Sequence, residues 1–96
     1  MHASISTFRG DPDELLAAYD AMVADVPAAS MRLHLCLRTG DGIVVIDTCP
    51  TREAFEAFFD GGPLRSLCAH HGLPDPVAVE DHPVHAAIAG GRRADR

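Results

Sequence analysis

The chain has 96 residues and a formal net charge of −6, and all eight of its Lys-plus-Arg residues are arginines. This length allows one domain with one hydrophobic core. The acidic balance argues against a surface that tracks the phosphates of nucleic acids. No apolar run is as long as a membrane span, and the start MHASISTFRG lacks the layout of a signal peptide. We therefore expect a cytoplasmic protein without nucleic-acid or membrane partners.

The residue types that are missing exclude further kinds of chemistry. The chain contains no Lys, Trp, Asn or Gln, so a lysine Schiff base is excluded. Neither a glycine-rich phosphate loop nor a Cys-x-x-Cys pair occurs. The three cysteines are odd in number and widely spaced, which favours free thiols over a disulfide framework. The sequence predicts no bound cofactor.

The first predicted elements are a strand and a helix. Residues 2–9, HASISTFR, alternate weakly and predict a strand. Asp11 suits the N-cap of a following helix, Pro12 suits its first position, and Glu14 lies three residues after the cap. The apolar residues at helical spacing are Leu15, Tyr19, Met22, Val23 and Val26. Pro27 ends this helix, which we expect to pack on a sheet.

Residues 31–51 predict a β-hairpin with its turn at Gly40-Asp41-Gly42. The first strand alternates, with leucines on one face and polar side chains and a thiol on the other. These are Leu33, Leu35 and Leu37 on one face, and Arg32, His34, Cys36 and Arg38 on the other. We assign the leucines to the helix side and the polar residues to the opposite side. The apolar run 43–46 of the second strand predicts burial on both faces.

The second half of the chain predicts a bent helix and a last strand. Thr51 can cap the helix, which Gly-Gly-Pro at 61–63 divides into two segments, the second ending at Gly72. Residues 77–88 predict a strand, in which Pro83 suits a sheet edge or a bulge. We therefore expect one domain over residues 1–90 and a frayed tail over residues 91–96.

The predicted elements follow the order β-α-β-β-α-β. This order is typical of an α+β, ferredoxin-like sandwich, in which a four-stranded antiparallel sheet carries two helices on one face. The other face of the sheet is left uncovered, with two apolar residues of the second hairpin strand exposed on it. We therefore predict a homodimer in which the two sheets pack face to face.

Three segments resemble the antibiotic biosynthesis monooxygenase-like family of dimeric α/β-barrel proteins. They are DTCPTREAF at 47–55, GLP at 72–74 and EDHPVH at 80–85. The resemblance implies a ferredoxin-like subunit, a dimer whose sheets form a barrel, and a small-molecule pocket. It also implies a cofactor-free enzyme, monooxygenase-like or an isomerase or lyase, acting on a small aromatic or polyketide-like molecule. Oxygenases and haem degraders of this kind use Trp and Asn, which this chain lacks, and Cys49 stands where many relatives have Trp.

His34 and Cys36 are the candidate catalytic residues. They lie two positions apart on one strand face, which places their side chains about 7 Å apart. The imidazole could lower the pKa of the thiol and make it a nucleophile, or act alone as a general base. The alternative is that the thiol only packs and that the histidine is a satisfied interior residue at the dimer contact.

Six further residues are expected to contact a substrate: Arg32, Arg38, Asp47, Phe55, Phe59 and His85. An arginine would stabilise an enolate or a carboxylate, and the phenylalanines would wall an apolar cavity. Asp47 could instead cap the turn that follows its strand.

His82 and His85 form a second histidine cluster, and one of them could meet His34 across the pocket. Their residue types suit zinc or copper, but their spacing is no metal signature, so no metal site is predicted. The second hypothesis for the whole protein is a non-catalytic dimeric module that holds a metabolite, haem or metal.

Overall fold

The computed structural model describes residues 1–26, 32–59 and 63–95, except for the side chains of residues 58, 59, 63 and 64. The elements in chain order are β1 (His2–Arg9), α1 (Pro12–Val23), β2 (His34–Thr39), β3 (Gly42–Cys49), α2 (Arg52–Phe59), α3 (Pro63–His70), β4 (Ala78–Pro83), β5 (Ile88–Ala89) and β6 (Arg92–Arg93). None of the helices described here is long and apolar enough to cross a membrane.

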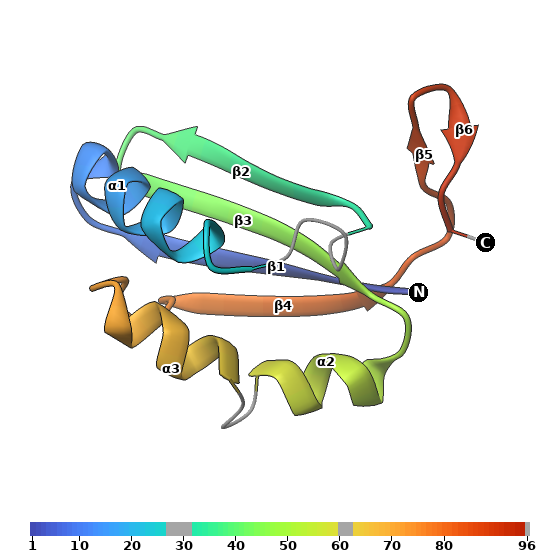
Figure 1. Cartoon of the computed structure of the whole chain (residues 1–96). Coiled ribbons are helices and arrows are strands. Elements are labelled where there is room, and N and C mark those ends of the chain that lie inside the picture. Colours follow the sequence, from blue (N-terminus) through green and yellow to red (C-terminus); the bar gives the residue numbers. More distant parts are fainter. Residues whose placement is uncertain (27–31, 60–62, 96) are drawn as a thin grey trace.

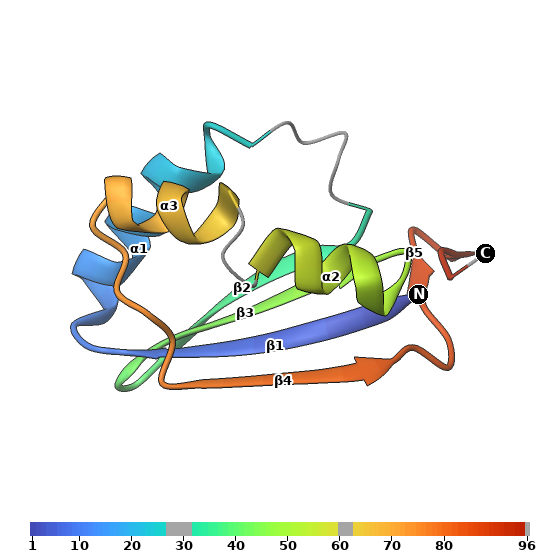
Figure 2. The ribbon, with the colours of Figure 1, turned by 90° about the horizontal axis from the view of Figure 1, so that it is seen from below.

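The main sheet has four strands in the order β2-β3-β1-β4, and every neighbouring pair is antiparallel. All three helices lie over one face of this sheet (Figures 1 and 2). We call the other side of the sheet the open face. The predicted α+β class and four-stranded antiparallel sheet are confirmed, and the strand order is compatible with a ferredoxin-like fold.

Helix α1 begins where the sequence predicts. The side chain of Asp11 accepts hydrogen bonds from the backbone N–H groups of Asp13, at 2.9 Å, and Glu14, at 3.3 Å. Pro12 occupies the first turn, where its missing N–H leaves no intrahelical bond unmade. The predicted helix end at Pro27 lies outside the described residues, and α1 itself ends at Val23.

The second helix is divided into α2 and α3, as the glycines predict. The Thr51 hydroxyl accepts a hydrogen bond from the Ala54 N–H at 3.1 Å and caps α2. Gly72, with φ of +79°, ends α3 in the left-handed conformation that favours glycine. The N–H of Leu73 then donates to the Cys68 carbonyl at 2.9 Å, which is a Schellman-type closure. This turn carries Leu73 back into the core.

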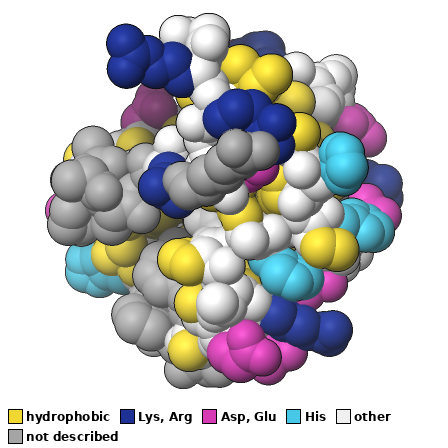
Figure 3. Space-filling view, turned by 90° about the vertical axis from the view of Figure 1, so that its right-hand side faces the viewer, with side chains coloured by type: hydrophobic (Ala, Val, Ile, Leu, Met, Phe, Trp, Pro, Cys, Tyr) yellow, Lys and Arg dark blue, Asp and Glu magenta, His cyan; other side chains and the backbone are white. Residues whose placement is uncertain are grey.

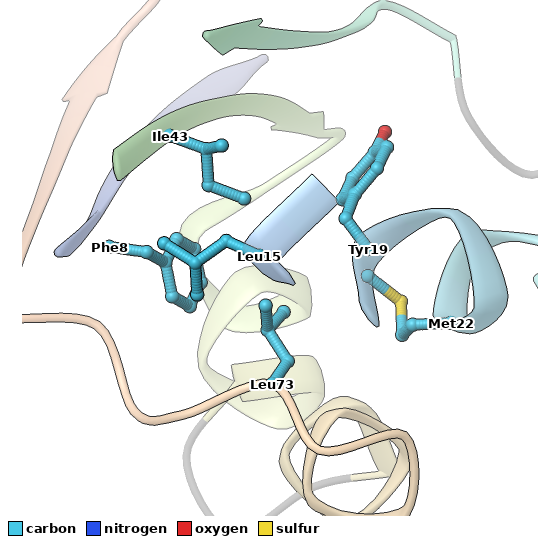
Figure 4. Close-up of a cluster of buried hydrophobic side chains, with 6 residues drawn as sticks. All are labelled: Phe8, Leu15, Tyr19, Met22, Ile43 and Leu73. Atoms are coloured by element: carbon cyan, nitrogen blue, oxygen red, sulfur yellow. The ribbon is translucent and has the colours of Figure 1, made fainter. Parts of the chain in front are cut away.

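The core lies between α1, the central strands and the turn after α3 (Figure 4). Its buried members are Phe8, Leu15, Tyr19, Met22, Ile43 and Leu73. Figure 4 shows the Tyr19 ring at the margin of this cluster, with its hydroxyl pointing away from it. The core therefore has a polar boundary on the Tyr19 side.

The register of the sheet decides which side chains face the helices. Directly opposed residues of antiparallel strands share a face. Ile43 of β3 lies opposite Phe8 of β1 and opposite Arg38 of β2. Ile43 and Phe8 belong to the core under the helices. Alternate residues of β2, counted back from Arg38, therefore face the helices too.

This register shows that the sequence-based assignment of the hairpin faces was wrong. His34, Cys36 and Arg38 point to the helix side, whereas Leu35 and Leu37 point to the open face and are 47% and 45% exposed. The physical reason is that alternation defines two faces of a strand but does not say which one the helices cover. The polar side chains of β2 therefore meet the helices, and its leucines do not.

The last strand is shorter than predicted. The sequence predicts a strand over 77–88, but β4 ends at Pro83, at the edge of the sheet where a proline is tolerated. A small hairpin of β5 and β6 follows, with Gly90 and Gly91 at its turn, both with positive φ. It projects beyond the end of the sheet (Figure 1).

The tail predicted to be frayed is ordered in this hairpin up to Asp95. The Asp95 carboxylate accepts two hydrogen bonds from Arg93, both at 2.7 Å, and one from the Ala87 N–H at 3.1 Å. The Arg93 and Ala87 bonds hold the pKa of Asp95 well below its usual range. The bond from Ala87 to Asp95 joins the two ends of the hairpin across eight residues, and a strand or helix pattern does not predict it.

Candidate functional site

A row of polar side chains crosses the sheet on the helix side. The strand register aligns His34 of β2, Asp47 of β3, Ser4 of β1 and Asp81 of β4. Ser4 is fully buried, and the side chains of His34 and Asp47 are each only 15% exposed. The half of the sheet that carries this row is therefore polar although helices cover it.

His34 lies between two polar groups. The Tyr19 hydroxyl, carried by α1, is 2.6 Å from its Nε2 atom, and the two rings are stacked with centroids 5.8 Å apart. The Asp47 Oδ1 atom is 3.2 Å from its Nδ1 atom, which is buried without an aligned hydrogen bond. The same carboxylate oxygen accepts the Thr48 N–H at 2.9 Å. Asp47 is thus held by its own turn, as one sequence hypothesis predicts, and also lies beside His34.

The surroundings of Tyr19 favour the protonated form of its hydroxyl. Burial, and to a lesser extent the nearby Cys36, Asp20 and Asp47, raises the pKa of Tyr19 to about 12. The phenol therefore keeps its proton at neutral pH, and the tautomer of the His34 ring sets which of the two groups donates in the hydrogen bond at Nε2.

Cys36 lies on the same strand face as His34 and packs against the core. Burial raises the pKa of the Cys36 thiol, and Asp20 raises it further. This direction is opposite to the one expected of a nucleophile that a histidine activates. Burial also raises the thiol pKa of Cys49 and Cys68. The described thiols are therefore held in their unreactive, protonated form.

Among the described residues, the side chains that contact the ring nitrogens of His34 are those of Tyr19 and Asp47, not those of the two candidate arginines. Arg38 faces the helix side but forms an exposed ion pair with Asp13, at 2.7 Å, near the start of α1. Arg32 is exposed in the segment that precedes β2. Of the expected binding residues whose side chains are described, Asp47 is the one that forms a contact with His34.

The aromatic candidates lie on α2. Phe55 is buried, which agrees with an apolar wall or with simple packing. Phe59 ends α2, and its side chain lies outside the described part of the structure. Tyr19 is the residue that sequence reasoning missed as a site residue, because it fits the apolar stripe of its helix. A phenol in an otherwise aliphatic stripe was the available signal, since a buried hydroxyl needs a hydrogen-bond partner.

The second histidine cluster does not meet His34. His82 lies opposite Ala3 on the open face, and β4 is separated from β2 by two strands, so the two edges are about 14 Å apart. His85 is exposed beyond the end of β4. Figure 3, which views this end of the molecule, shows histidine side chains at the surface among acidic and arginine side chains. Among the residues described, no group of three or more His, Cys, Asp or Glu side chains could hold a metal ion.

A second candidate surface lies on the open face. Five apolar side chains share it, Ile5, Leu35, Leu37, Val44 and Ile46, and we call them the apolar patch. The two leucines are about half exposed and the other three partly buried. The burial of both faces predicted for residues 43–46 is therefore complete only at Ile43, on the helix side.

Comparison with known proteins identified no protein similar to this chain. A scan against protein-family models, a search of curated proteins and a search of solved structures each found no match to this chain. The resemblance to the antibiotic biosynthesis monooxygenase-like family stays a prediction.

Proposed function

We propose that the protein acts as a homodimer of the dimeric α/β-barrel type, whose subunits meet through their open faces. The apolar patch is the observation that carries this proposal. Covering the exposed half of Leu35 or Leu37 stabilises the assembly by about 1 kcal/mol for each side chain. A sheet needs cover on its apolar face, and the described helices all lie on the other side.

The charges of the open face favour a second copy as the partner. The open-face positions of the four strands carry one arginine, Arg9, and one glutamate, Glu80, so their formal charges cancel. The chain as a whole carries −6. Two copies of an acidic protein repel each other least through a neutral surface. The open face is such a surface.

The test is the mass of the protein in solution by light scattering at micromolar concentration. Wild type is expected to be dimeric. Leu35→Asp buries an unpaired carboxylate in the interface and is expected to weaken association by about 100-fold, which is roughly 3 kcal/mol. Val79→Asp is the matched control, because Val79 is 46% exposed but lies on the helix side of β4. A monomeric wild type, or equal loss in both variants, would overturn the proposal.

A second candidate function is cofactor-free acid–base chemistry on a small molecule, with His34 as the general base. The contacts of Tyr19 and Asp47 to the two ring nitrogens favour it. Because Nδ1 faces Asp47, Nε2 is the atom that would take a proton, after a substrate replaces the Tyr19 hydroxyl there. The small aromatic or polyketide-like substrate comes from the family resemblance. In this reading Cys36 is a packing residue.

The test for this second function is exchange of solvent deuterium into small enolisable aromatic ketones. His34→Gln is expected to slow exchange by about 10²-fold or more. His71→Gln is the matched control, because His71 also pairs with a carboxylate, Asp25, at 2.7 Å and is also largely buried. Equal rates in the two variants would remove His34 as the base. Tight binding of a ketone without exchange would instead support the non-catalytic binding module.

A further inference from the structure

We infer that the two-fold axis of the dimer passes through the β2–β3 half of the open face, with Val44 and Ile46 nearest the axis and β4 at the rim. This inference rests on the proposed homodimer and adds the location of its centre. It follows from how apolar and charged side chains are distributed across the four strands.

The apolar side chains are concentrated on one half of the face. One cross-strand row of the open face is Leu35, Ile46, Ile5 and Glu80, from β2 to β4. The neighbouring row is Leu37, Val44, Thr7 and Ala78 in the same order. Both rows are fully apolar on β2 and β3 and become polar or small toward β4. Protein interfaces have an apolar centre and a polar rim, so the centre falls on the β2–β3 half.

The charged side chains exclude the opposite half as the centre. Residues near a two-fold axis meet their own copies, because the interface is isologous. Glu80 on β4 is exposed, and near the axis it would face a second Glu80 in a desolvated contact, which is costly for like charges. At the rim the same side chain stays in water. Apolar side chains such as Ile46 can face their own copies without this cost.

The charges at the margin of the face are also paired within the subunit. Glu80 lies 3.9 Å from His82 on β4, and Arg9 lies 3.6 Å from Asp41 at the hairpin turn. These four exposed side chains occupy the β4 edge and the β2–β3 turn end, not the apolar patch. A dimer centred on β3 therefore leaves both of these contacts at the solvated rim, where they stay intact.

Cysteine cross-linking can locate the axis. Packed sheets lie about 10 Å apart, so a residue near the axis can be joined to its own copy by a short bismaleimide of similar length. We would compare Ile46→Cys with Glu80→Cys, both of which add one thiol to the open face. The native Cys36 and Cys49 lie on the helix side and Cys68 lies on α3, so wild type measures the background.

The expected result is that Ile46→Cys gives covalent dimer at least about tenfold faster than Glu80→Cys or wild type. Each variant is first shown to be dimeric by light scattering, and Val44→Cys replaces Ile46→Cys where the latter dissociates. Faster cross-linking at Glu80 in a protein that is still dimeric would overturn the location of the axis and leave the homodimer standing. A monomeric wild type would overturn both.

Discussion

In most sheets the face under the helices is apolar and the face toward water is polar, but the two faces of this sheet partly reverse that distribution. The face under the helices carries the polar row that includes His34 and Asp47, next to an apolar core around Ile43. The open face carries the apolar patch, with Leu35 and Leu37 about half exposed. The chain's own helices thus cover polar groups and leave leucines in water.

The two faces of the same strands therefore need different kinds of partner. Covered polar groups must find partners inside the subunit, and Tyr19 is such a partner for His34. Uncovered apolar groups must find cover outside it. Substitutions on the helix side should therefore change the stability of the subunit, whereas substitutions on the open face should change its association.

The largest effect on stability is expected from Ile43→Ala. Ile43 is fully buried, so this truncation should lower the free energy of unfolding by about 2–5 kcal/mol at any protein concentration. Ile46→Ala removes the same atoms from the same strand on the other face. Its cost should grow with protein concentration, because in the proposed homodimer it weakens association. Urea unfolding at several concentrations measures both, and identical concentration dependence would contradict the separation of the faces.

A smaller effect is expected from Tyr19→Phe, which removes the hydroxyl that is hydrogen-bonded to Nε2 of His34. Leaving this buried nitrogen unpaired should cost about 1–3 kcal/mol in the free energy of unfolding. The double variant Tyr19→Phe/His34→Leu should be less destabilised than the sum of the two single variants, because both partners are then apolar. Strict additivity would mean that the contact contributes nothing to stability.

The titration of the Tyr19 hydroxyl gives a further test of its burial on the helix side of the sheet. Tyr19 is the single tyrosine of a chain without tryptophan, so its phenolate absorbance reports this residue alone. The pKa of Tyr19 is about 12 in the folded protein and about 10 in the unfolded chain. The folded state holds the proton longer, so this stabilisation is complete below pH 10 and is lost as the pH rises toward 12. Titration in urea is the control, and a midpoint near 10 without urea would contradict the burial of the phenol.

The smallest effect is expected from Arg38→Ala. Arg38 faces the helix side but pairs with Asp13 in water, where the two side chains are 56% and 81% exposed. The loss should stay below about 1 kcal/mol in the free energy of unfolding. Arg65→Ala is the matched control, because Arg65 forms a similar exposed pair with Asp75 at 3.2 Å. A clearly larger loss at Arg38 would extend the buried polar region to the hairpin end.

The elements could be predicted from local signals. Asp11 and Pro12 define the start of α1, and the Gly-Asp-Gly turn defines the hairpin. The Gly-Gly-Pro motif at 61–63 predicts two helical segments, and α2 ends at Phe59 while α3 begins at Pro63. Each of these signals acts within a few residues of the chain, through a helix cap, a tight turn or a break in a helix. Such signals are readable without knowledge of the fold.

Local signals could not predict which face of each strand lies under the helices. The buried residues of β1 are Ser4, Ser6 and Phe8, so two of these three are polar. The serines are small and lie under helices, yet a pattern of hydrophobicity assigns them to solvent. The site depends on that assignment, because His34 meets Tyr19 only when both lie on the same side of the sheet. Tertiary contacts with α1, which the strand pattern does not contain, decide it.

The strand order also has a consequence for how the chain is made. β1 lies between β3 and β4, so both of its neighbours leave the ribosome after it does. A nascent chain that has reached Cys49 can pair β1 with β3, but the other edge of β1 stays open until Pro83 has emerged. An open edge is a template for pairing with other chains. The interval between β3 and β4 is therefore the period in synthesis when this protein is most exposed to misassembly.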